Sequence, residues 1–486
     1  MASAETLQRP DVSEPNGPVT PPGSKVVPAV TPEQISIVKA TAPVLKEHGV
    51  TITTVFYENM LKDNPELKNV FSLTSQATGA QPRALAAAVL GYAMFIDDLP
   101  RLHHAVERIA HKHASLQIQP DQYDIVGKYL IQAIGQVLGD AATPSIVDAW
   151  TAAYGVLADV FIGRERSLYN EARARDNFKG WAGWRKFRIQ RREYAAAPDD
   201  EDSGDRTTTA SKDGILNLYL APVDGRPLPT YEPGQYVSLQ VFVPEFGVLQ
   251  SRQYSLSRAP RPSGDCYRVS VKRDTGNNGQ TTPGVISNLL HNVLKEGDEV
   301  ELSQPQGEFV VEETPLPTAE GAERPAVPTA ELAPIVLLSA GVGATPVMAI
   351  LETAAQHGRT ISWLHGSHSR SVLPFSKEVQ ALRAAHPERI QTYTVLTTAD
   401  DADDAAAAPA TTPTATATDP VVTGTHLKIA EMPDAERRAR LFLDNAKTGY
   451  YICGPSSFMI ESRDALQSLG VAPERIHLEL FETGDL

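Results

Sequence analysis

The chain has 486 residues and a formal net charge of −15, from 44 basic and 59 acidic side chains, which disfavours nucleic acid and anionic membranes as partners. Its length predicts roughly two to four domains, and a hydrophobic content of 42% is enough for buried cores. Because there are only two cysteines and no uninterrupted apolar run of roughly 18 residues, we expect a cytoplasmic protein without disulfides or a transmembrane segment.

The N-terminal third of the chain has a proline-rich start and then a helical pattern. Residues 1–28 contain six prolines and no apolar segment, which predicts a disordered tail. Thr31, Pro32 and Gln34 then form a capping box with proline at the first helical position. Apolar residues at helical spacing follow from residue 35 to 45, and further helical patterns lie at residues 52–61, 83–97, 101–113, 121–138 and 144–168. We therefore expect an all-α domain over residues 29–178.

The rest of the chain changes to strands. Residues 195–211 are acidic and polar, and short strand patterns then follow at residues 216–220, 236–243, 252–257, 267–272 and 300–302. They predict an antiparallel β-barrel domain over residues 184–312. After a low-complexity stretch at 312–332, an apolar strand at 335–338 opens an α/β domain over residues 333–486, with a low-complexity insertion at 397–423.

Four histidines lie on one predicted helix of the first domain. At 100° per residue, His113 falls on the same apolar face as Val106, whereas His111 lies about 140° and His104 about 160° away. Of these, and of His103, only His113 is therefore expected to point into the core. A buried imidazole is more often a satisfied core histidine than a metal ligand, so the helix alone leaves both interpretations open.

Two motifs of the barrel suit a dinucleotide. The segment YEPGQY at residues 231–236 is followed by RQYS at residues 252–255. The planar fork of Arg252 matches pyrophosphate, Tyr254 can lie against an isoalloxazine ring, and Ser255 can bond near a ring nitrogen. Either motif alone would be a weak strand-and-turn signal, but together at this spacing they indicate a flavin site.

A glycine motif begins the α/β domain. The segment GVGATP at residues 341–346 follows a buried strand, so backbone N–H groups and a helix N-terminus can approach a phosphate. A lone GxG can also be a tight turn, and Cys453 of the later CGP segment can be a small buried hydrophobe. After the strand WLHG at 363–366, no acidic residue is placed for a ribose 2′-hydroxyl and Arg370 is near, so the choice between NADH and NADPH stays open.

Residues 31–486 resemble a flavohaemoglobin, the nitric oxide dioxygenase family, in which a globin is fused to a ferredoxin-NADP reductase-like module. The matching globin segments are FYENM, NPELKNVF, QPRAL, KHASLQIQPDQYDIVG and AYGVLADVFIGRE. The resemblance implies haem b, FAD and NAD(P)H as cofactors, O2 and nitric oxide as small-molecule partners, and a monomer.

The same resemblance assigns the site residues. In the globin it implies His113 as the haem iron ligand, Tyr57, Tyr123 and Glu165 as catalytic residues, and Phe71, Gln81 and Leu85 as the distal pocket. For FAD it implies Tyr236, Arg252, Gln253, Tyr254, Ser255, Gly284, Val285, Ile286, Ser287 and Phe481. For NAD(P)H it implies Gly341, Val342, Gly343, Ala344, Thr345, Pro346, Cys453, Gly454 and Pro455, with Lys112 and Glu479 tuning electron transfer.

The implied activity is conversion of nitric oxide and O2 to nitrate, which would detoxify nitric oxide. The alternative is a haem-based O2 or nitric oxide sensor or carrier whose flavin half only keeps the iron reduced. A general flavin-dependent ferric or quinone reductase is a third candidate, which the globin half disfavours. A complete reductase half favours the enzyme, since a binding protein does not require separate flavin and nicotinamide sites.

Overall fold

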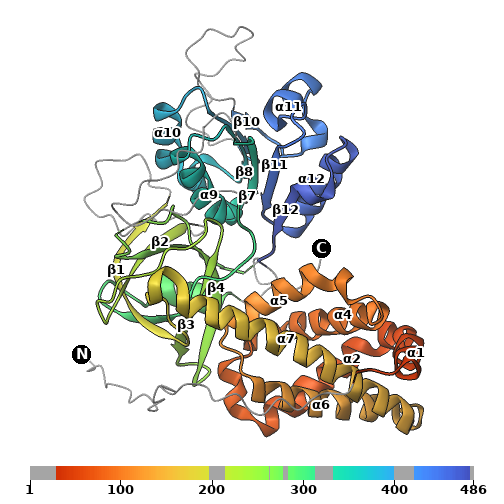
Figure 1. Ribbon diagram of the computed structural model, residues 1–486. Helices are drawn as coiled ribbons and strands as arrows, with labels where there is room; N and C mark the ends of the chain where they lie inside the picture. The colour runs from red at the N-terminus through yellow and green to blue at the C-terminus, as the bar shows by residue number, and fades with distance from the viewer. Residues whose placement is uncertain are drawn as a thin grey trace.

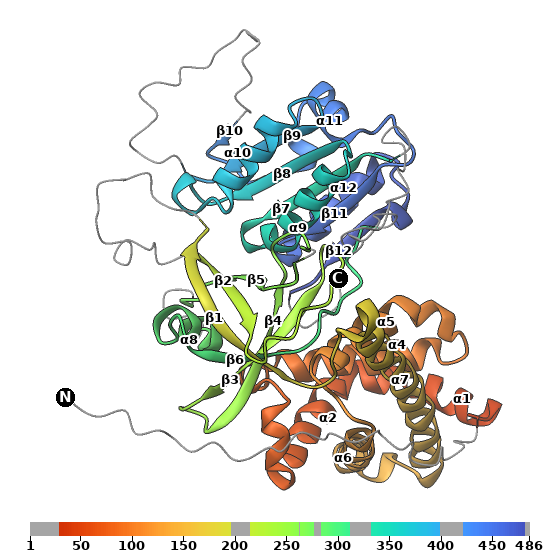
Figure 2. The ribbon, with the colours of Figure 1, turned by 60° about the vertical axis from the view of Figure 1, so that its left-hand side comes forward.

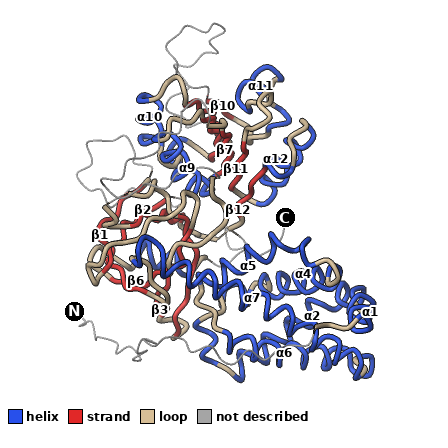
Figure 3. Tube along the Cα trace, viewed as in Figure 1, coloured by secondary structure: helices blue, strands red, loops and turns tan. Residues whose placement is uncertain are grey.

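Helices form one bundle in the first part of the chain (Figure 1, Figure 3). The computed structural model describes residues 29–195, 214–261, 263–276, 283–311, 332–398 and 421–481, so the predicted tail at 1–28 lies outside it. The helices are α1 (Pro32–Ala40), α2 (Ala42–Asp63), α3 (Leu73–Ala77), α4 (Ala80–Phe95), α5 (His103–Ser115), α6 (Pro120–Leu138) and α7 (Pro144–Phe178). The predicted capping box at Thr31 and Gln34 is present. The expected all-α domain is confirmed.

The first helical pattern is divided into two helices. The periodicity from residue 35 to 45 predicts one continuous helix, but α1 ends at Ala40 and α2 begins at Ala42, with a turn at Thr41. Proline in the first turn of α2 explains the break, because its ring cannot continue the hydrogen bonds of the preceding helix.

The barrel is a six-stranded antiparallel sheet in the order β4-β3-β6-β1-β2-β5. Its strands are β1 (Arg185–Tyr194), β2 (Ile215–Pro222), β3 (Tyr236–Val243), β4 (Val248–Ser255), β5 (Tyr267–Lys272) and β6 (Glu299–Leu302), and helix α8 (Val285–Asn292) follows β5. A bridge between Leu256 and Val269 joins the two edges. No strand was predicted at β1, because Phe187 and Ile189 are its only buried apolar residues and most of its other residues are charged.

The last part of the chain is a parallel sheet in the order β10-β9-β8-β7-β11-β12, with helices on both of its faces. Its strands are β7 (Ile335–Ala340), β8 (Ile361–Ser367), β9 (Ile390–Leu396), β10 (Val421–Thr423), β11 (Gly449–Cys453) and β12 (Ile476–Glu479). Figure 2 shows α9 (Ala344–Gln356) and α10 (Ser376–Ala385) on one face and α11 (Asp434–Leu441) and α12 (Ser456–Ser468) on the other.

The predicted insertion at 397–423 was too long at its C-terminal end. Val421–Thr423 form β10, which pairs in parallel with β9 from Val421 opposite Thr394 to Thr423 opposite Leu396. Valine and threonine are β-branched and favour this edge position. The residues between 398 and 421, and those from 312 to 331, lie outside the described part of the chain.

Helix α7 is the one described helix that is long and apolar enough, by length and composition, to cross a membrane. It packs against α1, α5 and α6 in the bundle. The Trp150 indole donates a hydrogen bond to Thr41 in the interior, and Glu165 places a buried carboxylate on the same helix. These contacts show that one face of α7 packs against the rest of the bundle.

Candidate functional site

His113, Tyr123 and Glu165 form one hydrogen-bonded group inside the bundle. His113 Nδ1 lies 2.8 Å from Glu165 Oε1 and 2.9 Å from Tyr123 Oη, and the Tyr123 hydroxyl donates to the same carboxylate oxygen at 2.5 Å. Glu165 is only 3% exposed. Because both neighbours of Nδ1 are acceptors toward it, Nδ1 carries the proton and the lone pair of Nε2 is left for a metal.

Burial and the Glu165 charge raise the pKa of the Tyr123 hydroxyl far above its usual range. The hydroxyl therefore remains a proton donor to the carboxylate at all physiological pH values. A carboxylate held in this way makes the imidazole more basic, which increases electron density on a bound iron.

Tyr57, Phe71 and Gln81 form a second group of contacts inside the bundle. The Tyr57 and Phe71 rings stand edge to face with centroids 5.6 Å apart, and the Tyr57 hydroxyl hydrogen-bonds to Gln81. Burial raises the pKa of Tyr57 far above its usual value, so its hydroxyl stays protonated and can donate. Leu85, one turn along α4 from Gln81, packs against the same hydrophobic cluster. The predicted catalytic Tyr57 thus contacts two of the three predicted distal-pocket residues, and the third, Leu85, packs against the cluster that contains Tyr57.

His111 has a role that the periodicity did not reveal. It points away from the bundle core, as predicted, but its side chain lies against the barrel. His111 Nδ1 is 2.8 Å from Gln306 Oε1 and 3.2 Å from the Gly307 nitrogen. Burial lowers the pKa of this imidazole. No local sequence pattern marks such a contact, because its partners are almost two hundred residues away.

The flavin motif lies on β4 against the globin. Burial lowers the pKa of the Arg252 guanidinium. Ser255 is 4% exposed, and within the described residues its Oγ has no hydrogen-bond partner. Tyr254 is partly buried and packs against the barrel core. The partly buried Arg252 guanidinium donates only to the Ser251 carbonyl at 2.9 Å, and the buried Ser255 hydroxyl has no partner among the described residues. A cation and an unpartnered hydroxyl three residues apart fit an anionic cofactor with ring acceptors.

Two globin contacts hold this motif. Tyr236 on β3 hydrogen-bonds to Ser115, and the Gln253 amide donates to the same Ser115 hydroxyl at 3.3 Å. Ser115 is fully buried and lies two residues after His113. The predicted flavin residues Tyr236 and Gln253 are therefore in direct contact with α5, the helix that carries His113.

Four of the residues predicted for FAD, Gly284, Val285, Ile286 and Ser287, lie at the N-terminus of α8. Gly284 is its N-cap, and a Cβ there would lie 2.8 Å from Ser287 Oγ and from the Asp274 side chain. Ser287 Oγ accepts from the Asp274 N–H at 3.3 Å, which holds the loop closed. Val285 starts the helix and Ile286 is 2% exposed. Residues 277–282 of the preceding turn lie outside the described part of the chain.

The glycine motif lies at the carboxyl end of β7, beside the CGP segment. Gly341 has a positive φ of 54°, and a Cβ at Gly343 would lie 2.1 Å from the Cys453 carbonyl oxygen. Val342 accepts a hydrogen bond from Thr345 Oγ1 at 3.0 Å. Ala344, Thr345 and Pro346 form the first turn of α9, Gly454 follows β11, and Pro455 is the N-cap of α12. All nine predicted nicotinamide residues thus meet at one sheet edge, where dinucleotides bind in such folds.

Charged residues of all three parts meet near the flavin motif. Burial raises the pKa of the Glu479 carboxyl to about 8, and the Glu308 carboxylate adds to this rise while Arg108 and Lys112 oppose it. Burial lowers the pKa of Lys112, as do the charges of Arg108 and Arg252. Glu479 also pairs in register with Cys453. The charges of Lys112 and Glu479 therefore act on each other, and their role in tuning electron transfer stays a prediction.

Phe481 is placed differently from Glu479. It follows the end of β12 and is 43% exposed, and residues 482–486 lie outside the described part of the chain. Its contact with a flavin therefore stays a prediction.

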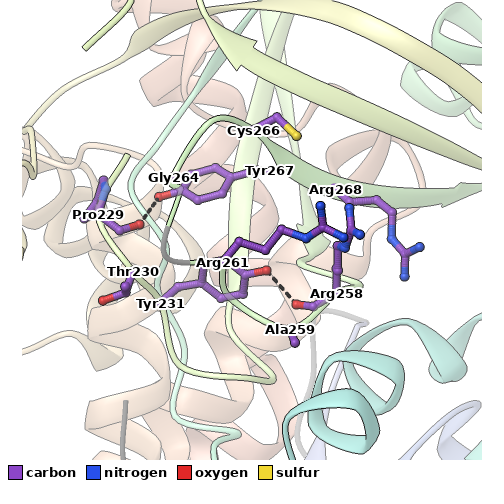
Figure 4. A pocket seen from close by; sticks show the side chains of 10 residues that line it. All are labelled: Pro229, Thr230, Tyr231, Arg258, Ala259, Arg261, Gly264, Cys266, Tyr267 and Arg268. Carbon is purple, nitrogen blue, oxygen red and sulfur yellow. Dashed lines mark hydrogen bonds between the residues drawn. The ribbon is translucent and has the colours of Figure 1, made fainter. Parts of the chain in front are cut away.

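Two cavities lie away from the predicted site residues. Figure 4 shows one of about 10 Å³ in the barrel, where the Tyr231 hydroxyl donates to Arg258 O and the Tyr267 hydroxyl to Pro229 O. It is no larger than a water molecule. An apolar cavity of about 270 Å³ is lined by Tyr92 of α4, by the segment 99–102 and by residues of α5 and α7, and none of the predicted site residues lines it.

Comparisons with known proteins agree with this geometry. The globin family model matches residues 54–161, and the oxidoreductase NAD-binding domain model matches residues 337–464. A flavohemoprotein from Bordetella pertussis is 42% identical over 459 residues, which is 94% of this chain and 99% of that protein. One from Bacillus subtilis is 37% identical over 449 residues, covering 92% and 96% of the two chains. The chain belongs to the flavohemoprotein family.

A solved flavohemoglobin supports the same assignment. The crystal structure of the protein from Malassezia yamatoensis, with bound FAD and heme, superposes with a TM-score of 0.72 at 28% identity and covers 93% of this chain and all 100% of its own. Membership of the flavohemoprotein family and the NAD-binding domain together make this chain an NAD(P)H-dependent oxidoreductase.

Proposed function

We propose that this chain is a nitric oxide dioxygenase that binds haem b, FAD and NAD(P)H and converts nitric oxide and O2 to nitrate. Haem supplies the iron that activates O2, and FAD converts a hydride into single electrons. The observation that carries the proposal is the hydrogen bond from His113 Nδ1 to the buried Glu165 carboxylate. It supports an electron-rich iron, which favours oxygen chemistry over simple storage.

The chain's own residues are assigned as follows. His113 would hold the iron, and the Tyr57 hydroxyl would donate a hydrogen bond to the O2 substrate, on which negative charge gathers. Phe71, Gln81 and Leu85 shape the distal pocket. Arg252 pairs with the FAD pyrophosphate, and the glycines at 341 and 343 let backbone N–H groups reach the NAD(P)H phosphates. Lys112 and Glu479 adjust the charge between the flavin and the haem.

The contact between Ser115 and the flavin motif supports electron transfer from the flavin part to the globin part. The Ser238 hydroxyl of β3 donates to Ser115 Oγ at 2.8 Å, in addition to the bond from Gln253 at 3.3 Å. A sensor or carrier whose iron is kept reduced by the flavin half would use the same contact. Repeated turnover requires it, because the iron must be reduced again in each cycle, so the nitrate formed per NAD(P)H consumed separates the two functions.

The test compares nitrate formed with NAD(P)H consumed in the full chain, in Arg252→Ala and in Arg261→Ala. We expect nitrate to accumulate with NAD(P)H use in the full chain. Arg252→Ala should retain FAD weakly and reduce haem slowly with an unchanged haem spectrum, whereas Arg261, which is exposed, serves as the control. A full chain that holds haem and FAD but makes nitrate only once would support the sensor or carrier instead.

A further inference from the structure

The side chain of Gln250 connects β4 to the globin. It is 3% exposed and lies two residues before Arg252. Its Oε1 accepts from the Leu73 N–H at 2.9 Å, and its Nε2 donates to Lys68 O at 2.6 Å and to Phe71 O at 3.3 Å. One amide thus binds three backbone groups of the turn between α2 and α3.

That turn carries a wall of the distal pocket. Phe71 stands edge to face with Tyr57, which hydrogen-bonds to Gln81. Asn69 adds a second bond to the same strand, because its Oδ1 accepts from the Leu249 N–H at 2.9 Å. The backbone on both sides of Phe71 is therefore tied to β4 rather than only to its own helices.

The strand is well suited to hold this position. β4 pairs with β3 over eight registered residues, from Val248 opposite Val243 to Ser255 opposite Tyr236. Toward its other end, Gln253 reaches Ser115 at the proximal helix. A paired strand cannot slide by one residue without reversing the side of every side chain, so its two ends move together.

We propose that Gln250 is a positioning residue that fixes Phe71, and through it the Tyr57 hydroxyl, from the flavin domain. The inference rests on the proposed function in one respect, namely that O2 binds beside Tyr57. Without the Gln250 amide, the Leu73 N–H and the Lys68 carbonyl lose their partner and the turn opens to water. The Phe71 ring then no longer holds the Tyr57 hydroxyl in its direction, and bound O2 is released faster.

The test uses full-length holoprotein carrying Gln250→Leu, with Gln304→Leu as a matched control. Gln304 is also 3% exposed, and its amide donates to the carbonyls of Ala172 and Trp181 at 2.9 and 2.6 Å, away from Phe71. Two quantities are measured: amide hydrogen exchange over residues 68–73, and O2 release from the ferrous protein by stopped flow.

We expect faster exchange at Leu73 and roughly three- to tenfold faster O2 release in Gln250→Leu, with FAD retention and flavin reduction by NAD(P)H unchanged. Gln304→Leu should change neither the hydrogen exchange of residues 68–73 nor the rate of O2 release. Asn69→Ala, which leaves β4 intact, is the second variant in case Gln250→Leu does not fold, and it should shift both measurements in the same direction.

Faster exchange at Leu73 with unchanged O2 release would show that Gln250 does not act on Tyr57. Equal effects in Gln250→Leu and Gln304→Leu would show a general loosening of the interface and would also overturn the proposal. Unchanged exchange at Leu73 would show that the Gln250 amide does not hold the backbone of residues 68–73 in place. The exchange measurement requires no turnover. If the wild-type protein makes no nitrate, the proposed dioxygenase activity is wrong, but hydrogen exchange still tests whether Gln250 holds residues 68–73.

Discussion

The carboxylate of Glu165 on α7 and the imidazole of His113 on α5 are joined by a hydrogen bond of 2.8 Å, although 52 positions separate them in the chain. Helices α5 and α7 pack against each other, and that contact brings the two side chains together. The bond requires the proton on Nδ1 and so leaves the lone pair of Nε2 for a metal.

Glu165→Gln should keep the hydrogen bond but lose the charge. A glutamine oxygen can still accept from Nδ1, so haem binding should persist, while the less basic imidazole should lower the iron–histidine stretching frequency and slow turnover by about 10- to 100-fold. Resonance Raman spectra and nitrate formation measure these effects. Glu171→Gln, whose side chain is 59% exposed on the same helix, is the control. An unchanged frequency would remove Glu165 from the proximal site.

His113→Ala should abolish specific haem binding. The other histidines of α5 cannot replace it, because His103 and His104 are exposed and His111 contacts Gln306. Haem titration with optical spectra tests this, and His104→Ala should bind haem normally. If His113→Ala gives a normal five-coordinate spectrum, another ligand holds the iron.

Tyr57→Phe should leave the fold intact, since only one hydroxyl is lost and the ring contact with Phe71 remains. A hydrogen bond to a charge-bearing oxygen contributes roughly 1.5 to 3 kcal/mol, so O2 release should become on the order of tenfold faster or more. Stopped-flow measurement checks this. Tyr92→Phe removes a hydroxyl that donates to the Ala153 carbonyl, and it should have no such effect. Unchanged O2 release in Tyr57→Phe would place the hydroxyl outside the site.

Gly343→Ala should weaken NAD(P)H binding. The added Cβ would lie 2.1 Å from the Cys453 carbonyl oxygen, so the glycine loop and the CGP segment must move apart. Overpacking of this kind costs roughly 1 to 3 kcal/mol, and if that cost falls on binding, KM for NAD(P)H should rise about 5- to 150-fold. FAD content should not change. Gly163→Ala is the control, because nothing lies within 4 Å of its Cβ. An unchanged KM would contradict the close approach.

Glu479→Gln should change how stability depends on pH. The folded-state pKa of Glu479 is raised to about 8 from an ordinary 4.5, so the unfolded chain ionises first as pH rises. Its contribution to stability is fully present below pH 4.5 and is lost as pH rises through about 8. Glu479→Gln lacks this loss, so its melting temperature relative to wild type should rise over that window, by on the order of a few degrees. A constant difference from pH 5 to 9 would show that Glu479 ionises normally.

Local patterns were sufficient for most of the helices and for the order of the three parts. The capping box at Thr31 and the spacing of apolar residues depend only on near neighbours, which is why they could be read correctly. Strand β1 and the short β10 were missed, because their charged or brief patterns become strands only when β2, β6 and β9 supply the hydrogen bonds.

The sequence by itself determined which residue types the site contains: His113 on an apolar helix face, Arg252 in its motif and the glycines at 341 and 343. Only the tertiary structure decided that Glu165 meets His113, that His111 and Ser115 contact the barrel, and that Gln250 holds the backbone at Phe71. These contacts join residues 52 to 195 positions apart. Local periodicity contains no information about such pairs, because they depend on how whole helices and strands pack against one another.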